Sequence, residues 1–423
     1  MQRRPDSQRV VITGLGAMSP LGHTVDELWS GLVAGRSGIG PITQFDPGDL
    51  PCKIAGEVKD FKPANWINFK EARRMGRASQ LAVATLHEAL QDAGLPTTLP
   101  EDLQERAGVC VGTAVGPFEK SDEEIQNYRK KGWRAASPFG LTATLASMPA
   151  HHISVAAQTK GPIATPVNAC ASGTQAIVEG AEIIRRGHVD LMIAGGVEGL
   201  IIEYAIAGFA AMRALSLNNA APDRASRPFD KNRDGFILSE GCGLMVLESL
   251  AHATARGAHI YAEVLGGASS SDAYHMAAPD PTGAGAVRAM KWALRDAGVD
   301  VSEVDYINAH GSSTPLNDAM ETLAIKTLFG EHAYNLPISS SKSMIGHCMG
   351  SAGTLEAIAC VKTIQTGTIH PTINYDTPDP VCDLDYVPNT SRRADVHITL
   401  SNSFGLGGNN ACIVLGEYRN GHH

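Results

Sequence analysis

Two segments that lie far apart in the chain repeat one another. Residues 173–187 and residues 353–367 both open with Gly-Thr and end with Gly fourteen residues later, and they are identical at four of fifteen positions. Each carries apolar residues at helical spacing, and a glycine directly after the last turn is a common end of a helix. Each segment also begins just after a loop with a candidate catalytic residue. The repeat therefore predicts a duplicated α/β unit whose two copies meet at one active site.

The rest of the pattern alternates apolar strands with helices. We expect strands over residues 9–14, 108–112 and 189–194, and helices over residues 25–33, 79–93 and 174–186. Such alternation is typical of an α/β fold with largely buried sheets. Gly195-Gly196 is expected to close the third strand, and the polar stretch 216–234 is expected to form a surface loop. The two copies are expected to join near residues 250–265.

Composition excludes some classes of protein. The net charge of −9 argues against a general nucleic-acid binder, which needs a dominant basic field. The eight cysteines form no CxxC pair and lie mostly in apolar runs, so we expect free buried thiols in a reducing compartment. No segment approaches the length of a membrane span, and the first apolar run is too short and too broken by glycine for a signal peptide. A cytoplasmic location without membrane contact is therefore expected.

One cysteine and two histidines lie in settings that favour catalysis. Cys170 stands between a β-prone run and the first turn of the helix expected over residues 174–186. The positive end of a helix dipole and its unpaired N–H groups lower the pKa of a thiol there and make it a nucleophile. His310 and His347 follow in glycine-framed loops. A cysteine with two histidines suggests acyl transfer to sulfur, followed by stabilisation of a second, carbonyl-derived anion.

Two short patterns resemble motifs of other protein classes but are incomplete, and a third such motif is absent from the sequence. Gly14-Leu15-Gly16 follows a strand as in a dinucleotide-binding fingerprint, but the third glycine is missing. Residues 230–235 look like the opening of a calcium loop, yet the acid expected at position twelve is replaced by Gly241, so we expect a structural turn. The sequence holds no GxSxG elbow of the serine hydrolases.

Several longer motifs occur in a fixed order over nearly the whole chain. They are Val10-Val11-Ile12-Thr13-Gly14-Leu15-Gly16, Ala169-Cys170-Ala171-Ser172-Gly173, Arg227-Pro228-Phe229-Asp230, Arg233-Asp234-Gly235-Phe236, Glu240-Gly241, Ala309-His310-Gly311, Lys342-Ser343, Ile345-Gly346-His347, Gly350-Ser351-Ala352-Gly353, Glu356 and Asn402-Ser403-Phe404-Gly405. In this order the chain resembles the β-ketoacyl-[acyl-carrier-protein] synthases of the Cys-His-His type. It is most similar to the synthase II branch and to ketosynthases of type II polyketide systems.

The resemblance implies an α/β, thiolase-like fold of five layers (αβαβα) made of two similar halves. The N-terminal half, residues 1–256, would carry the nucleophile, and the C-terminal half, residues 257–423, the histidines and the gating loop. The implied reaction is a decarboxylative Claisen condensation that elongates fatty acids. An acyl chain moves to Cys170, and malonyl-acyl carrier protein then loses CO₂ and attacks it to give 3-oxoacyl-acyl carrier protein.

The resemblance also implies roles for the other catalytic residues. His310 and His347 would donate hydrogen bonds to the enolate oxygen. Lys342 would pair with Glu356 and fix the histidine loops. Phe404 would gate the nucleophile, and its backbone N–H would form the oxyanion hole together with that of the nucleophilic cysteine.

Some residues implied to bind substrate depart from the family pattern. Ser312, with Thr314 nearby, stands where threonine is commoner but keeps a hydroxyl for the pantetheine amide. Val115 replaces a larger aliphatic residue that gates the acyl tunnel, and Gly140 replaces a bulky aromatic that faces the tunnel of the partner subunit. We therefore expect the chain to accept longer or more rigid acyl groups, including polyketide-like ones.

The gating loop departs from the pattern too. It reads Phe404-Gly405-Leu406-Gly407-Gly408-Asn409-Asn410, where the family usually has phenylalanine at the third position and threonine at the sixth. We expect the smaller leucine to change how the loop swings.

The resemblance implies no metal and no cofactor, since substrates are carried on the phosphopantetheine of acyl carrier protein. A homodimer is expected, with a heterodimer containing a chain-length factor as the alternative. Carrier proteins are acidic, so docking on this acidic chain requires a local basic patch. Lys70, Arg73 and Arg74 are spaced for one helical face, with Arg134 and Arg213 expected near the tunnel mouth.

Four alternative functions stay open. The first is a ketosynthase of a type II polyketide or other specialised pathway. The second, a Cys-His-Asn enzyme that primes from coenzyme A, is disfavoured because both loops carry histidine. The third, a non-catalytic chain-length partner, would lack Cys170. The fourth, a thiolase or other coenzyme A acyltransferase, would use a second cysteine such as Cys412 as its base.

Overall fold

The main sheet consists of two sets of five strands with the same topology. The computed structural model describes residues 4–419. The N-terminal set is ordered β5 (Ile163–Ala164), β4 (Ala107–Gly112), β6 (Leu191–Glu198), β7 (Gly241–Ser249) and β1 (Val10–Met18). The C-terminal set is ordered β10 (Ile338–Ser339), β9 (Tyr306–Asn308), β13 (Ile398–Gly405), β14 (Asn409–Gly416) and β8 (Ala262–Ser271). The shared strand order agrees with the duplicated α/β unit that the sequence repeat predicts.

Strand directions match as well. In the N-terminal set β1 lies antiparallel to β7, and β7 lies antiparallel to β6. In the C-terminal set β8 lies antiparallel to β14, and β14 lies antiparallel to β13. The other strands run parallel to one another, in the orders β6, β4, β5 and β13, β9, β10. The sets join where β1 pairs with β8 through Val11 with Glu263 and Ile12 with Ala262.

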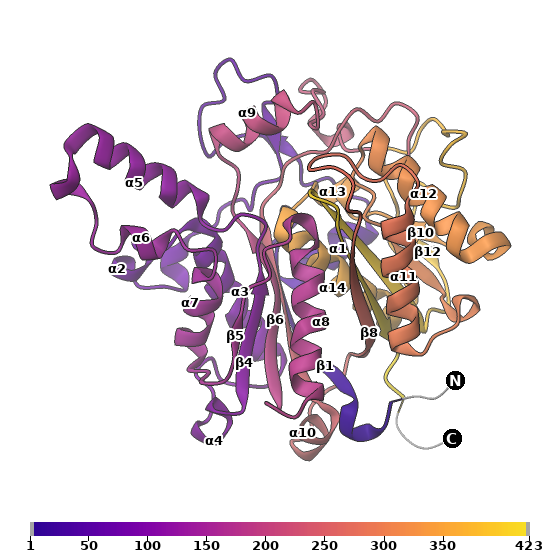
Figure 1. Ribbon diagram of the computed structural model, residues 1–423, viewed down its shortest axis with the longest axis horizontal. Helices are drawn as coiled ribbons and strands as arrows, with labels where there is room; N and C mark the ends of the chain where they lie inside the picture. Colours follow the sequence, from indigo (N-terminus) through magenta and orange to yellow (C-terminus); the bar gives the residue numbers. More distant parts are fainter. Residues whose placement is uncertain (1–3, 420–423) are drawn as a thin grey trace.

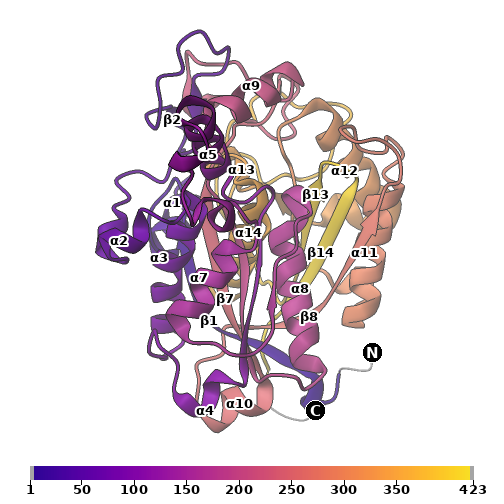
Figure 2. The same ribbon diagram turned by 60° about the vertical axis from the view of Figure 1, so that its left-hand side comes forward.

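Helices cover both five-stranded sets and fill the space between them (Figures 1 and 2). Between the two sets lie α8 (Ser172–Arg185) and α14 (Ala352–Thr366), which contact each other and strands of both sets. The outer layers are formed by α3 (Arg77–Asp92) with α7 (Met148–Ala157), and by α11 (Ala284–Ala297) with α12 (Pro315–Phe329). The predicted five-layered αβαβα fold is confirmed.

The remaining elements are short or peripheral. They are α1 (Val25–Val33), α2 (Phe69–Ala72), α4 (Glu101–Gln104), α5 (Phe118–Lys131), α6 (Gly140–Ala143), α9 (Glu203–Ala211), α10 (Leu250–Ala255), α13 (Lys342–Ile345), β2 (Gly40–Pro41), β3 (Ile54–Ala55), β11 (Thr368–Ile369) and β12 (Arg392–Arg393). α10 lies between β7, which belongs to the N-terminal set, and β8, which belongs to the C-terminal set. α5 and α6 form an arm that projects from the body (Figure 1). No helix among residues 4–419 combines the length and the apolar character needed to cross a bilayer.

The repeated glycines let α8 and α14 meet closely at their N-termini. A Cβ at Gly353 would lie 2.0 Å from the hydroxyl oxygen of Thr174, and one at Gly173 would lie 2.7 Å from that of Thr354. Any larger side chain would separate the two helices. Because each helix follows a catalytic loop, this contact brings the two loops together.

Two sequence expectations about glycines and loops were wrong. Gly195-Gly196 does not close a strand but lies inside β6. Glycine is needed at position 196 because a Cβ there would lie 2.3 Å from the backbone oxygen of Gly350. The segment 216–234 is not simply a surface loop, since Phe229 and Asp230 are fully buried.

The glycines of the apparent dinucleotide motif also serve packing. Gly14 and Gly16 lie inside β1, against α3. A Cβ on them would lie 2.4 Å from the backbone oxygen of Ala89 and 2.6 Å from that of Thr85, respectively. The motif therefore sets the distance between a strand and a helix and forms no phosphate-binding turn.

Candidate active site

The nucleophile candidate lies on a tight turn that leads directly into α8. Cys170 occupies a short 3-10 turn over residues 169–171 and is buried. Ala169 adopts a left-handed backbone (φ 50°), a conformation that costs an L-residue on the order of 1 kcal/mol. The turn is held by the N–H of Asn168, which donates to the Ser172 hydroxyl at 2.8 Å. This strained turn places Cys170 in the wall of a cavity.

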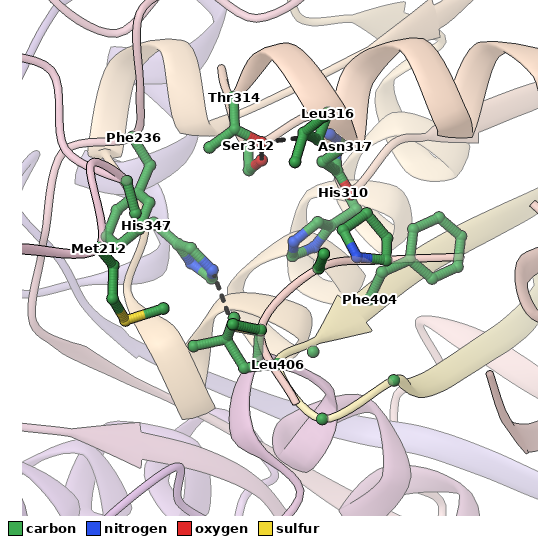
Figure 3. A pocket seen from close by; sticks show the side chains of 18 of the residues that line it. Met212, Phe236, His310, Ser312, Thr314, Leu316, Asn317, His347, Phe404 and Leu406 are labelled. Carbon is green, nitrogen blue, oxygen red and sulfur yellow. Dashed lines mark hydrogen bonds between the residues drawn. The ribbon is translucent and has the colours of Figure 1, made fainter. Parts of the chain in front are cut away.

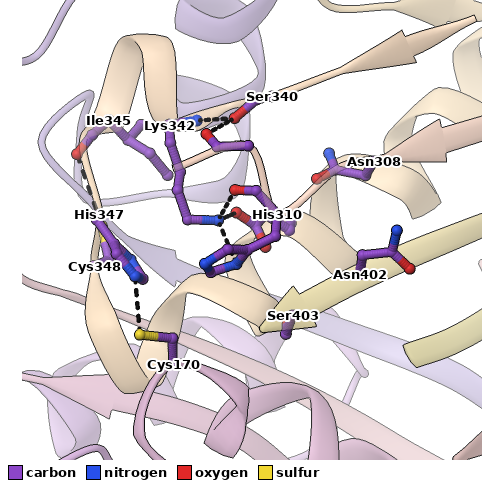
Figure 4. Close-up of polar contacts among 12 residues, drawn as sticks. Cys170, Asn308, His310, Ser340, Lys342, Ile345, His347, Cys348, Asn402 and Ser403 are labelled. Atoms are coloured by element: carbon purple, nitrogen blue, oxygen red, sulfur yellow. Dashed lines mark hydrogen bonds and ion pairs between the residues drawn. The ribbon is translucent and has the colours of Figure 1, made fainter. Parts of the chain in front are cut away.

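The two histidines reach the sulfur from the C-terminal half (Figure 4). His310 follows β9, and His347 follows α13 after Gly346, whose backbone is left-handed. Nε2 of His347 lies 3.0 Å from Sγ of Cys170, and the two imidazole rings are 5.2 Å apart between centroids. The duplicated halves thus meet at one buried centre.

Hydrogen bonds determine where each imidazole carries its proton. Nδ1 of His347 accepts the backbone N–H of Met349 at 3.3 Å, and Nδ1 of His310 faces the Lys342 ammonium at 3.4 Å. Both partners can only donate, so each neutral ring has its proton on Nε2. Burial, reinforced by the charge of Lys342, holds the pKa of both histidines well below its usual value. The site therefore presents two neutral N–H donors to whatever lies beside the sulfur.

The same three side chains have the spacing of a metal site. One ligand atom from each of Cys170, His310 and His347 lies within 4.8 Å of the others. A metal would need unprotonated Nε2 atoms, however, and the donors on both Nδ1 atoms oppose that tautomer. The arrangement therefore suits donation of hydrogen bonds better than metal binding.

A buried ion pair supports the His310 loop. The ammonium of Lys342 donates to the backbone oxygen of His310 at 2.7 Å and pairs with the carboxylate of Glu356. From the other side, the carboxylate of Glu321 accepts the N–H groups of His310 and Gly311, each at 2.8 Å. Both sides of the loop are thus fixed, and Glu321 is a contributor that the sequence reasoning missed.

The expectation of a low pKa for the nucleophile was wrong. Burial is the largest influence and raises the pKa of Cys170 to about 11. The charge of Lys342 and the backbone N–H groups of Leu406 and of Cys170 itself oppose that rise. The position of Cys170 at the start of a helix, which led to the expectation of a low pKa, does not show how deeply its sulfur is buried.

We expect alkylation of Cys170 by iodoacetamide to accelerate about tenfold per pH unit between about pH 7 and 9, because only the thiolate reacts. Intact-protein mass spectrometry over a pH series measures this rate, and Cys170→Ala gives the background from the other cysteines. A rate that levels off near neutral pH would restore the expectation of a low pKa.

The gating loop lies beside the nucleophile. The backbone N–H of Leu406, two residues beyond Phe404, lowers the pKa of the Cys170 thiol. The Phe404 ring lies 5.8 Å from the His310 ring. The oxyanion hole expected from the N–H groups of Cys170 and Phe404 stays a prediction.

A cavity of about 490 Å³ opens in front of these groups (Figure 3). Its wall includes Ser312 and Thr314, whose hydroxyls lie 2.9 Å apart, and also Leu406 and Cys170. The cavity does not reach Val115 or Gly140 within the single chain. The tunnel roles of these two residues stay predictions.

The space beside Gly140 is filled within the chain. A Cβ there would lie 2.6 Å from a carboxylate oxygen of Glu124 on α5. The missing aromatic side chain therefore leaves no void in this arm, because a flexible acidic side chain takes its place.

The predicted docking residues do not share a helical face. α2 ends at Ala72, so Lys70 lies on the helix whereas Arg73 and Arg74 lie in the turn that follows. All three side chains are nevertheless exposed and lie on one short segment. The guanidinium of Arg74 stacks 4.3 Å from the Phe139 ring.

The other two docking residues are apart from that segment. Arg213 lines the cavity. Arg134 lies on the projecting arm, with its guanidinium 4.9 Å from the Trp133 ring. The docking roles of both arginines stay predictions.

The cysteine that a thiolase would need is absent from this cavity. Cys412 is fully buried in β14, where its thiol donates to the side-chain oxygen of Asn402 at 3.1 Å. It does not line the cavity in front of Cys170. This placement disfavours the thiolase alternative.

A Cys-His-His centre between two like halves of a five-layered fold defines a thiolase-like condensing enzyme. Comparison with protein families agrees, since the model of the β-ketoacyl synthase N-terminal domain matches residues 7–253 and that of the C-terminal domain matches residues 261–376. The chain belongs to the β-ketoacyl synthase family.

Individual relatives cover almost the full length. The 3-oxoacyl-[acyl-carrier-protein] synthase 2 of Synechocystis is 46% identical over 414 residues, 98% of this chain and 99% of the relative. Among solved structures, the ishigamide ketosynthase/chain length factor has a TM-score of 0.91 at 41% identity, covering 99% of this chain and 100% of the other. A type II polyketide ketosynthase in complex with its acyl-carrier protein has a TM-score of 0.89 at 35% identity, with the same coverage.

Proposed function

We propose that the chain is an acyltransferase of fatty acid elongation. It condenses an acyl chain held on Cys170 with malonyl-acyl carrier protein and releases CO₂ and 3-oxoacyl-acyl carrier protein. The observation that carries this proposal is the pair of neutral N–H donors, on His310 and His347, that faces a buried nucleophile. The similarity to 3-oxoacyl-[acyl-carrier-protein] synthase 2 supports fatty acids as the product class.

The geometry accounts for both half-reactions. In the first, the Cys170 thiolate attacks the acyl thioester, and the backbone N–H groups of Cys170 and Phe404 stabilise the oxyanion until the carrier thiolate leaves. In the second, the C–C bond to the malonyl carboxylate breaks and CO₂ departs. The electron pair moves to the thioester oxygen, where the N–H groups of His310 and His347 stabilise it. The enolate carbon then attacks the acyl carbonyl and expels the Cys170 thiolate.

The direct test is to supply acyl-acyl carrier protein and malonyl-acyl carrier protein and to identify the product by mass spectrometry. A carrier-bound chain two carbons longer, with a 3-oxo group, is expected, together with one CO₂ per turnover. If malonyl-acyl carrier protein is consumed only when coenzyme A thioesters are present, the priming alternative is correct instead.

A ketosynthase of a specialised polyketide pathway is the second candidate. Its support is the similarity to the ishigamide and type II polyketide ketosynthases and the small residues at positions 115 and 140. Both candidates share the same chemistry. They differ in the length and unsaturation of the acyl chain that is accepted.

Gly140→Phe is expected to shorten the longest acyl chain accepted while short-chain turnover stays near normal, because an aromatic ring would narrow the tunnel. A ring here must also displace the Glu124 carboxylate, whose position is flexible. Turnover of a series of saturated and unsaturated acyl-acyl carrier proteins measures the effect, with Gly140→Ala as the control for loss of glycine. An unchanged chain-length profile would show that this position does not border the tunnel.

The chain is proposed to act as a dimer with an acyl carrier protein as its partner, in the cytoplasm. The projecting arm supports a subunit interface, since α5 has no buried residue and exposes 48% of Ile125 and 58% of Tyr128. We favour a homodimer because the chain carries its own nucleophile. A heterodimer is the alternative, because one similar structure is a ketosynthase/chain length factor.

Charge reversal at Arg73 and Arg74 is expected to raise KM for carrier-bound substrates several-fold and to flatten its salt dependence, with kcat nearly unchanged. Both side chains are exposed, so the fold should tolerate the change. Reversal of Lys291 and Arg295, which are exposed on α11, changes the net charge equally and serves as control. An equal KM in the two double variants would remove residues 70–74 from the docking surface.

A further inference from the structure

A buried carboxylate links the N-terminal half of the site to the loop that carries His347. Glu198 is the last residue of β6 and is fully buried. One of its carboxylate oxygens accepts a hydrogen bond from the Thr113 hydroxyl at 3.0 Å. The other accepts the backbone N–H groups of Ala114 at 2.6 Å and of Gly350 at 3.1 Å. Because Gly350 follows His347 in the C-terminal half, the carboxylate joins segments from both halves.

The partners of this carboxylate are neutral, so it acts as a hydrogen-bond acceptor and not as half of an ion pair. Burial raises the pKa of Glu198 to about 7, and its hydrogen bonds act against that rise. The side chain does not line the cavity in front of Cys170, so it does not contact a substrate bound there. What the carboxylate can influence is therefore the backbone that it holds.

That backbone includes a strained turn directly after His347. Residues 349–351 form a short 3-10 turn, and Met349 adopts a left-handed backbone (φ 47°), which L-residues rarely do. The N–H of Met349 is the donor that Nδ1 of His347 accepts, at 3.3 Å. The next peptide group along the chain is held by Glu198 through the N–H of Gly350. Release of that peptide group would let Met349 relax and would withdraw its N–H from the imidazole.

The same strand brings the turn within reach of the carboxylate. A Cβ at Gly196, two residues before Glu198 in β6, would lie 2.3 Å from the backbone oxygen of Gly350. Glycine at position 196 therefore lets the turn approach the strand closely enough for Glu198 to accept the Gly350 N–H. β6 thus supplies both the space for the turn and the acceptor that fixes it.

We propose that Glu198 is a positioning residue that, through Gly350 and Met349, keeps the ring proton of His347 on Nε2. The inference rests on the proposed function, because this N–H is one of the two donors to the enolate oxygen in malonyl decarboxylation. No hydrogen bond joins Glu198 to either catalytic histidine among the described residues, so its effect passes through the turn. Loss of the carboxylate therefore weakens the contribution of His347 and leaves that of His310 intact.

The test compares double variants in full-length protein. Release of CO₂ from radiolabelled malonyl-acyl carrier protein is measured in a Cys170→Gln background, at a mildly alkaline pH at which Glu198 is ionised. Glu198→Ala removes the acceptor, whereas Glu198→Gln keeps the shape and one acceptor oxygen. Each variant is made with both histidines present, with His347→Asn and with His310→Asn. Asparagine offers an N–H whose position does not depend on a ring tautomer.

With both histidines present, Glu198→Ala is expected to lower kcat for CO₂ release about tenfold, while KM stays within about twofold. The same change is expected to cost less than about twofold in His347→Asn but again about tenfold in His310→Asn, because residues that act through one another are not additive. Glu198→Gln is expected to show the same pattern with a smaller loss of about threefold.

Glu57→Ala is the matched control. Glu57 is also a buried carboxylate that accepts a threonine hydroxyl and two backbone N–H groups, those of Thr43 and Gln44. It does not line the cavity in front of Cys170. Release of CO₂ by this variant is expected to stay within about twofold of its background.

A loss in the His347→Asn background as large as in the other two, or no loss with either Glu198 variant, would overturn the positioning role. Should Glu198→Ala not fold, Glu198→Gln, which preserves the packing, decides by the same comparison. An unmodified protein that releases no CO₂ from malonyl-acyl carrier protein would instead refute the proposed function itself.

Discussion

Replacement of Cys170 with alanine is expected to abolish condensation, with a loss of at least about 10³-fold in kcat/KM. The acyl chain has no other nucleophile at this position, since Cys170 is the one cysteine that lines the cavity among the described residues. Formation of 3-oxoacyl-acyl carrier protein, measured by mass spectrometry, gives the rate. Elongation by this variant would show that the covalent mechanism is wrong.

Two companion variants make the result specific. Cys170→Gln is expected to keep malonyl decarboxylation, because the N–H groups of His310 and His347 survive and the amide imitates an acylated cysteine in size. Cys412→Ala removes a buried thiol outside the cavity and is expected to keep condensation. Loss of condensation in Cys412→Ala, with a folded protein, would favour thiolase-type chemistry.

The fold could be predicted because its strongest determinants are local. The glycine that ends each repeated helix adopts the left-handed backbone that a helix end requires, with φ of 72° at Gly187 and 59° at Gly367. The alternation of apolar strands and helices predicted the α/β class, whereas the five layers were implied by the resemblance to the ketosynthases. The role of Gly196 could not be predicted, because the backbone that approaches it comes from residue 350.

The sequence predicted which side chains form the site better than it predicted the backbone conformation around them. Cys170, His310 and His347 stand in recognisable motifs, and the structure brings them together. The turn that places Leu406 in the cavity wall contains two glycines with left-handed backbones, Gly407 and Gly408, whose conformation residue spacing does not specify. The pKa of the nucleophile was misjudged for a similar reason, since burial depends on packing from both halves. The basic segment failed as a helical face because α2 ends at Ala72.

Breaking the buried ion pair from one side is expected to have the largest effect on stability. In Glu356→Ala the ammonium of Lys342 keeps His310 as a partner but loses the only carboxylate that it pairs with among the described residues. An unpaired charge in a buried site costs about 3–5 kcal/mol of unfolding free energy. Denaturant unfolding at fixed protein concentration measures the change, with Glu356→Gln as a milder variant that keeps an acceptor.

Removal of both charges separates stability from catalysis. In the double variant Lys342→Met with Glu356→Leu, no charge is left unpaired, so stability should return to within about 1–2 kcal/mol of the unmodified protein. Decarboxylation should stay low, because Nδ1 of His310 has lost the donor that keeps the ring proton on Nε2. A double variant that regains both stability and decarboxylation would show that Lys342 and Glu356 are needed only to neutralise each other. One that regains stability alone would assign Lys342 to orienting the imidazole, since the N–H donor is what the enolate oxygen requires.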